Sequence, residues 1–177
     1  MIRSSDITVV TATITGREHF LEECRASVEA QTTSPFEHLV YHDVEGRGIQ
    51  HSMNTLWPRV VTPWMQWVAD DDLLFPEHLE KVAALADPAD IVHAYCEVEN
   101  RPGFLPNYRA EDSDYWMTAT ALMRVSMIEA LDGWHDTDFP EDHFFWVKAA
   151  AAGYVFDVVE EPTWRYRFHG GNLSWNG

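Results

Sequence analysis

The chain has 177 residues, of which 46% are apolar and 13% aromatic, so it can form one domain with a packed core and is not a disordered protein. Its net charge is −17, with 12 basic residues against 29 acidic ones, which disfavours binding to nucleic acid through phosphate contacts. With two cysteines, no apolar run of transmembrane length and no signal-like N-terminus, we expect a cytoplasmic protein without a disulfide framework or membrane span.

The first half of the chain alternates between strand and helix patterns. The β-branched run Ile7–Thr13 predicts a buried parallel strand, and Thr15 and Glu18 have the capping-box spacing that predicts the start of a helix. The further elements expected in this half are a strand at Glu37–Asp43, a short helix over Gln50–Trp57 and a strand at Pro63–Ala69. Such alternation is typical of a parallel sheet with helical connections.

The second half continues the alternation. The expected elements, in order, are a helix from Pro76 to Ala86, a strand at Asp90–Val98, a loop over Asn100–Asp114, a strand within Tyr115–Met123, helices at Ser126–Leu131 and Pro140–Ala152, a strand at Tyr154–Val159, and an aromatic tail over Trp164–Trp175. We find no repeat and no linker, so residues 1–177 are interpreted as a single α/β domain with a mainly parallel central sheet flanked by helices.

Polar residues gather where the expected strands end. Thr11–Thr13, Asp43 and Asp70–Asp72 each close a strand, and ligands of open α/β sheets bind beyond the carboxyl ends of the strands. Neither GxGxxG nor GxxxxGK[ST] occurs, which argues against a dinucleotide oxidoreductase and a P-loop protein. We therefore expect the functional site at this edge of the sheet.

The triplet Asp70–Asp72 is the most informative of these segments. Three adjacent carboxylates repel one another unless a cation lies among them, and oxygen ligands of this kind suit Mg²⁺ or Mn²⁺. The alternative is a solvated acidic turn that caps the helix beginning at Pro76. In so acidic a chain, a metal would also be needed to bridge the protein to a phosphorylated substrate.

Motifs along nearly the whole chain resemble, in order, those of GT-A-type nucleotide-sugar glycosyltransferases of family 2. They are Ser27-Val28-Glu29-Ala30-Gln31, the strand ending in Asp43, the segment Gly48–Asn54, VADDDLLFP with its DXD-like aspartates, Leu131-Asp132-Gly133-Trp134, Pro140-Glu141-Asp142-His143, and Tyr166-Arg167-Phe168-His169 with Asn172 and Ser174. Two departures are Ala69, where the family often has aspartate, and Met53, where it often has arginine.

The resemblance implies a single-domain, Rossmann-like GT-A fold. Its nucleotide-sugar-binding half would span about residues 1–98, and its acceptor and catalytic-base half about 99–177. The activity implied is metal-dependent, inverting transfer of a hexose from a nucleoside-diphosphate sugar, UDP-sugar being favoured, to a hydroxyl acceptor. The cofactor implied is Mn²⁺ or Mg²⁺.

The resemblance also implies site residues. Asp71 is the expected metal ligand, with Asp72 and His169 as further ligands, and Asp142 is the expected general base beside Glu141. The residues expected to contact the nucleotide are Thr11, Thr13, Asp43, Asn54, Asp70 and Arg167. Simpler interpretations remain open: Glu141 and Asp142 complement a helix dipole, His169 is a packing residue, and the threonines cap strands.

Two other functions are consistent with this fold. A catalytically inactive module that binds a nucleotide sugar or a partner is one, although Asp70–Asp72 and Asp142 together speak against it. A nucleotidyltransferase is the other, but it would need a basic, glycine-rich segment after the first strand, where this chain has only Gly16 and Arg17.

Overall fold

The computed structural model describes residues 2–100, 104–105, 118–135 and 141–169. The helices are α1 Glu18–Glu29, α2 Ile49–Leu56, α3 His78–Leu85, α4 Val125–Ala130 and α5 Glu141–Ala151, with 3₁₀ turns at Ser4–Asp6 and Trp57–Arg59. The strands are β1 Ile7–Thr13, β2 Glu37–His42, β3 Trp64–Trp67, β4 Leu73–Leu74, β5 Ile91–Val98, β6 Phe104–Leu105, β7 Ala121–Arg124 and β8 Phe156–Tyr166. Among the described residues, no helix is both long and apolar enough to cross a bilayer.

All the strands belong to one sheet with the order β2-β1-β3-β7-β5-β8-β4, and β6 pairs with β5. The pairs β1–β2, β1–β3 and β5–β8 are parallel, whereas β7 is antiparallel to both β3 and β5. Strands β1, β2, β3, β5 and β8 therefore run in one direction, and their carboxyl ends share one edge. The mainly parallel sheet predicted from the sequence is confirmed.

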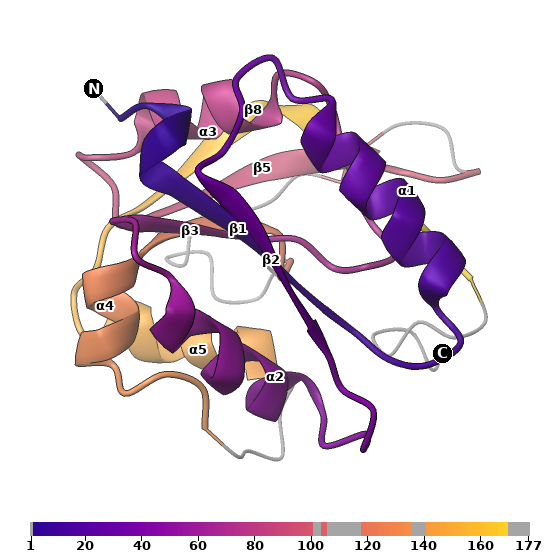
Figure 1. Ribbon diagram of the computed structural model, residues 1–177. Helices are drawn as coiled ribbons and strands as arrows, with labels where there is room; N and C mark the ends of the chain where they lie inside the picture. The colour runs from indigo at the N-terminus through magenta and orange to yellow at the C-terminus, as the bar shows by residue number, and fades with distance from the viewer. Residues whose placement is uncertain (1, 101–103, 106–117, 136–140, 170–177) are drawn as a thin grey trace.

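Helices cover both faces of the sheet (Figure 1). On one face, α1 and α3 bury Cys24, Val28 and Leu79 against the aliphatic side of the sheet. On the other face, α2, α4 and α5 pack over a more aromatic core that contains Trp67 and Trp146. Alternate residues of β1 serve the two faces, since Val9 joins the first cluster and Val10 the second, as expected for a strand buried on both sides.

Helix α1 begins differently from the capping-box prediction. The residue at its N-cap is Arg17, which makes no side-chain capping bond, and Glu18 Oε1 accepts a hydrogen bond from the Gly16 N–H at 3.0 Å. Gly16 has a φ of +91°, a left-handed conformation that suits glycine and redirects the chain before the helix. The prediction of a cap at Thr15 is therefore wrong, and Arg17 stands at the start of the helix.

Strand β8 is longer than predicted. The sequence favoured a strand ending at Val159 followed by a tail, but the pairing with β5 continues to Tyr166. The register shifts at Ala94 and Tyr95, and Tyr95 lies opposite Pro162. A proline donates no hydrogen bond, so it breaks the strand pattern in sequence, and the bulge accommodates it. As a result, Trp164–Tyr166 is part of the sheet and carries the chain to the edge where the aspartates lie.

Candidate functional site

A tight turn after β3 presents the aspartate triplet. The Asp72 N–H donates to the Ala69 carbonyl at 3.1 Å, so Asp70 and Asp71 occupy the two central positions of the turn. The three aspartates are only 3%, 8% and 4% exposed. This burial excludes a solvated acidic turn. The triplet does not cap a helix either, because α3 begins at His78 with Glu77 at its N-cap.

Ser27 of α1 and Gln31, just after the end of that helix, hold the segment that follows the turn. Ser27 Oγ accepts a hydrogen bond from the Leu74 N–H at 3.1 Å. The Gln31 amide donates to the Phe75 carbonyl at 2.7 Å and accepts from the Leu79 N–H at 2.9 Å. The Ser-Val-x-x-Gln motif of the sequence therefore has a structural role: it fixes the chain on the carboxyl side of the triplet.

An arginine and a histidine contact Asp71. The Arg17 guanidinium pairs with Asp71 Oδ2 and also lies 3.1 Å from Asp70 Oδ1. His169 Nε2 is 3.0 Å from Asp71 Oδ2, and the imidazole stacks on Phe20 of α1 at 4.6 Å between ring centroids. Asp71 and His169, both predicted to be metal ligands, are thus brought together by segments 98 residues apart.

Arg17 was missed by the sequence analysis as a site residue. Its signal was available: it is a basic residue directly after the first strand, on the edge where the acidic triplet was expected to need positive charge. Its side chain is 19% exposed, and its Nε is buried without a hydrogen-bond partner among the described residues.

Burial makes the other two aspartates difficult to ionise. Asp70 accepts a hydrogen bond from the Thr13 hydroxyl at 2.6 Å, yet burial, with the nearby Asp71 charge, raises the pKa of Asp70 above its ordinary value. Burial and the Asp71 charge raise the pKa of Asp72 well above its ordinary value, although Asp72 Oδ1 accepts a hydrogen bond from the Arg167 N–H at 3.3 Å. Both pKa shifts come mainly from burial, to which the Asp71 charge adds.

Arg167, predicted to contact the diphosphate, is only 5% exposed. Its guanidinium donates to the Asp71 carbonyl oxygen and pairs with Glu23 of α1, and it lies 4.8 Å from the centroid of the Phe20 ring. These contacts tie the end of β8 to α1 and to the backbone of the aspartate turn. Arg167 is thus a member of the site, with its donors directed to the protein.

Asp43, the expected base contact, lies at the end of β2. Its Oδ2 accepts a hydrogen bond from the Gly48 N–H at 2.8 Å, whereas its buried Oδ1 has no partner in the described part of the chain. Burial opposes ionisation, but the backbone N–H groups of Arg47, Gly48 and Gly46 outweigh it and lower the pKa of Asp43. Asp43 thus presents one ionised acceptor oxygen at neutral pH.

Two other residues expected at the nucleotide are engaged elsewhere. The Thr11 hydroxyl is 2.9 Å from His38 Nε2, and burial lowers the pKa of His38 to about 4. The Asn54 amide donates to the Trp134 carbonyl at 2.7 Å and accepts from the Trp134 N–H at 3.0 Å. Asn54 therefore clamps the Gly133–Trp134 segment to α2, which gives two sequence motifs one structural role.

Asp142, the expected general base, lies in the first turn of α5. This helix packs on the sheet and leads into β8, so it runs against the parallel strands and begins toward their carboxyl edge. Asp142 is half-buried, and its Oδ1 accepts a hydrogen bond from the His143 N–H at 2.8 Å. The side chain of Glu141, and Asn172 and Ser174, lie outside the described residues.

The residues present fit a divalent cation that is shared with a substrate. In the described part of the chain, no three acidic, histidine or cysteine side chains converge to hold a metal by themselves. Asp71 and His169 supply one carboxylate and one imidazole beside Asp70. Such a partial set is what Mg²⁺ or Mn²⁺ uses when substrate phosphates and water complete its coordination.

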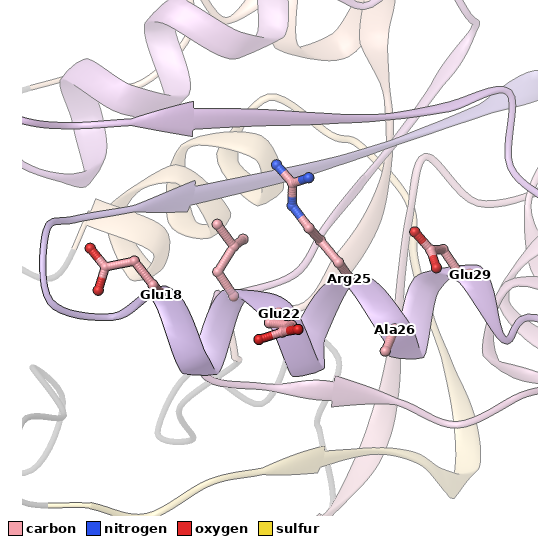
Figure 2. A pocket seen from close by; sticks show the side chains of 6 residues that line it. Glu18, Glu22, Arg25, Ala26 and Glu29 are labelled. Atoms are coloured by element: carbon pink, nitrogen blue, oxygen red, sulfur yellow. The ribbon is translucent and has the colours of Figure 1, made fainter.

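A shallow groove of about 470 Å³ lies along α1 (Figure 2). The described residues that line it, all from α1, are Glu18, Leu21, Glu22, Arg25, Ala26 and Glu29. None of the aspartates of the turn is among them, and the groove lies on one face of a single helix. We therefore place the functional site at the strand ends and not in this groove.

Comparison of the structure with solved proteins identifies the fold. No protein-family model matches the chain, and no curated protein matches it in sequence. Among solved structures, residues covering 92% of this chain superpose on 60% of S. aureus TarS 1–349 in complex with UDP, with a TM-score of 0.78 and 16% identity. The complex of the same protein with UDP-GlcNAc gives 0.76, also at 16% identity, over 94% of this chain and 59% of that one.

A second similar protein is a mannosyltransferase. The mannosyltransferase PcManGT from Pyrobaculum calidifontis, in complex with GDP-Man and Mn²⁺, has a TM-score of 0.71 and 16% identity, covering 97% of this chain and 59% of that one. This chain thus spans about 60% of the length of these proteins. The similarity confirms the predicted architecture: the chain has a GT-A-type fold.

Proposed function

We propose that this protein is a metal-dependent, inverting glycosyltransferase that moves a sugar from a nucleoside-diphosphate sugar to a hydroxyl acceptor. The observation that carries the proposal is the buried Asp70–Asp71 turn beside Arg17 and His169, at the carboxyl edge of a GT-A sheet. Similar structures that hold UDP, UDP-GlcNAc, and GDP-Man with Mn²⁺ support the class of donor.

On this proposal the residues at the sheet edge divide the binding of the donor. Asp43 Oδ1 accepts the ring N–H of the nucleotide base, Asp70 contacts the ribose, and Asp71 and His169 hold Mn²⁺ or Mg²⁺ against the diphosphate. The metal supplies positive charge beside the leaving diphosphate. Asp72 is buried and accepts a hydrogen bond from the Arg167 N–H, which holds the turn to the end of β8.

Asp142 takes the proton of the attacking acceptor hydroxyl, from the first turn of α5. The new glycosidic bond forms as the bond to the diphosphate breaks, and the proton passes to the Asp142 carboxylate. Because the acceptor attacks directly and one base assists, the configuration at the anomeric carbon inverts. A uridine nucleotide is the favoured donor, and UDP- and GDP-linked hexoses are the first to be tested.

The proposal is tested by thermal denaturation with UDP, GDP, dTDP, CDP and ADP, each with and without Mn²⁺. We expect the midpoint to rise with at least one diphosphate, and to rise further when Mn²⁺ is present, because ligands that bind only the folded state stabilise it. Incubation with UDP- and GDP-hexoses, followed by mass spectrometry, then identifies the donor by its hydrolysis. The absence of any nucleotide effect with Mn²⁺ would contradict the proposal.

Replacing the proposed base separates binding from catalysis. Asp142→Asn should leave nucleotide binding unchanged and reduce transfer or donor hydrolysis by about 100-fold or more, as expected when a general base is lost. Glu129→Gln, an exposed carboxylate on α4, is the matched control. Wild-type turnover in Asp142→Asn would show that another group accepts the proton, whereas nucleotide binding without turnover in the wild type would favour an inactive binding module.

A further inference from the structure

Building on the function proposed above, we propose that Arg17 is an exchangeable counter-cation. Without donor it neutralises Asp70 and Asp71 in the place that a divalent metal would take, and when metal and donor bind together it moves to the donor diphosphate. Metal binding and nucleotide binding are thereby coupled through one side chain.

The position of Arg17 carries the first step. One guanidinium nitrogen lies within ion-pair distance of carboxylate oxygens of both Asp70 and Asp71, between the two central side chains of the turn. Asp71 Oδ2 contacts both Arg17 and His169 Nε2, so a metal held by Asp71 and His169 needs the oxygen that Arg17 occupies. Arg17 and the metal therefore compete for this carboxylate.

The guanidinium of Arg17 also has unused bonding capacity. Its Nε is buried and makes no hydrogen bond to the described residues, although a guanidinium has five N–H donors in a fork that matches phosphate oxygens. Both guanidinium groups lie over the Phe20 ring, but Arg167 is also held by the Asp71 carbonyl and by Glu23. Of these two arginines, Arg17 is the one whose contacts to the turn consist of carboxylates that a metal would claim.

The backbone around Arg17 allows the exchange. Arg17 follows three exposed residues, Ile14, Thr15 and Gly16, and it stands at the N-cap of α1 without a side-chain capping bond. No heavy atom lies within 4 Å of where a Cβ on Gly16 would be, so this loop is open. The long side chain can thus leave the carboxylates without disturbing the packed face of α1, which buries Cys24 and Val28.

The test uses Arg17→Met, which keeps most of the side-chain length and removes the charge. Binding of Mn²⁺ alone is followed by electron paramagnetic resonance of the free ion, and binding of UDP or GDP at saturating Mn²⁺ by calorimetry. We expect Mn²⁺ alone to bind about 10-fold more tightly to the variant than to the wild type, and the diphosphate to bind about 10-fold more weakly, within the usual range of coupling between sites.

Opposite signs distinguish this role from a structural one, because a damaged site would weaken both ligands. Arg25→Met, an exposed arginine on the same helix, is the control and should change neither affinity. Unchanged or weaker Mn²⁺ binding in Arg17→Met overturns the proposal. If that variant does not fold, the neutral Arg17→Gln takes its place, and an unchanged Mn²⁺ affinity there overturns it equally. The metal measurement needs no nucleotide, so a failure of the proposed function, seen as no nucleotide binding to the wild type, is recognised separately.

Discussion

Two aspartates at the same sheet edge are neutralised in opposite ways. Asp71 is compensated by the Arg17 guanidinium, a side-chain cation that a metal held by Asp71 and His169 can replace. Asp43 is compensated by backbone N–H groups of the loop before α2, which cannot leave, and it keeps one oxygen without a partner. The first arrangement suits a cation that comes and goes, and the second a fixed acceptor that selects a neutral donor N–H.

The largest expected effect comes from removing Asp71, the carboxylate for which Arg17 and a metal compete. Asp71→Ala removes a proposed metal ligand, and since loss of an outer-shell partner alone costs 10- to 100-fold in metal affinity, we expect a loss of at least about 100-fold in Mn²⁺-dependent binding of UDP or GDP. Calorimetry with and without Mn²⁺ measures it. Glu22→Ala, an exposed carboxylate on α1, is the control. Metal-dependent nucleotide binding by Asp71→Ala would show that other residues hold the metal.

The role of Asp43 as a fixed acceptor is tested by Asp43→Asn. An amide places an N–H₂ group either against the Gly48 N–H or at the unpartnered position, so one hydrogen bond is lost in each case. We expect a loss of about 1–3 kcal/mol, or roughly 5- to 150-fold in affinity, for UDP, whose base has a ring N–H. CDP, whose base lacks it, should be affected less. An equal loss for both nucleotides would show that Asp43 does not read the base.

The sequence predicted which strand ends meet at this edge of the sheet, but not all the side-chain contacts there. The strand ends at Thr13, Asp43 and Asp70–Asp72 were predicted to meet because parallel strands end at one edge, and the hydrogen bond from Thr13 to Asp70 shows that β1 and β3 do so. Strand patterns specify where a chain ends a strand, and the sheet topology then brings the ends together. This part of the site follows from local sequence and one rule of topology.

The side-chain assignments required tertiary information. Thr11 and Thr13 lie on the same face of β1. The Thr13 hydroxyl donates to Asp70 in the turn, whereas the Thr11 hydroxyl contacts His38. The site position of Arg17 depends on a left-handed glycine, after which α1 starts two residues later than the capping box predicted. The continuation of β8 past Pro162 depends on a bulge. None of these follows from periodicity.

Rigidity on the Asp43 side is tested by Gly133→Ala. Gly133 has a φ of +64°, and a Cβ there would lie 2.4 Å from Asn54 Oδ1, the atom that accepts the Trp134 N–H. We expect the free energy of unfolding to fall by about 2–3 kcal/mol, from backbone strain and loss of the clamp. Gly153→Ala, with a φ of +86° and open space, reports strain alone and should cost about 1 kcal/mol. Equal losses would mean that the clamp contributes little.

The smallest expected effect concerns a buried histidine that joins α3 to β8. His78 begins α3, its Nδ1 is 2.7 Å from the Thr163 hydroxyl of β8, and burial lowers its pKa from 6.5 to about 3. The folded protein keeps this histidine neutral, whereas the unfolded chain takes up a proton below pH 6.5. Stability is therefore lost as the pH falls from about 6.5 toward 3.

In the variant His78→Asn, this contribution to the pH dependence is absent. Between pH 7 and pH 5 the wild type should lose about 2 kcal/mol more of unfolding free energy than the variant, measured by urea denaturation at each pH. His38 and His93 remain in both proteins and cancel in the difference, and His42→Asn, at an exposed position near Asp43, is the control. Equal losses in wild type and His78→Asn would show that folding does not change the pKa of His78.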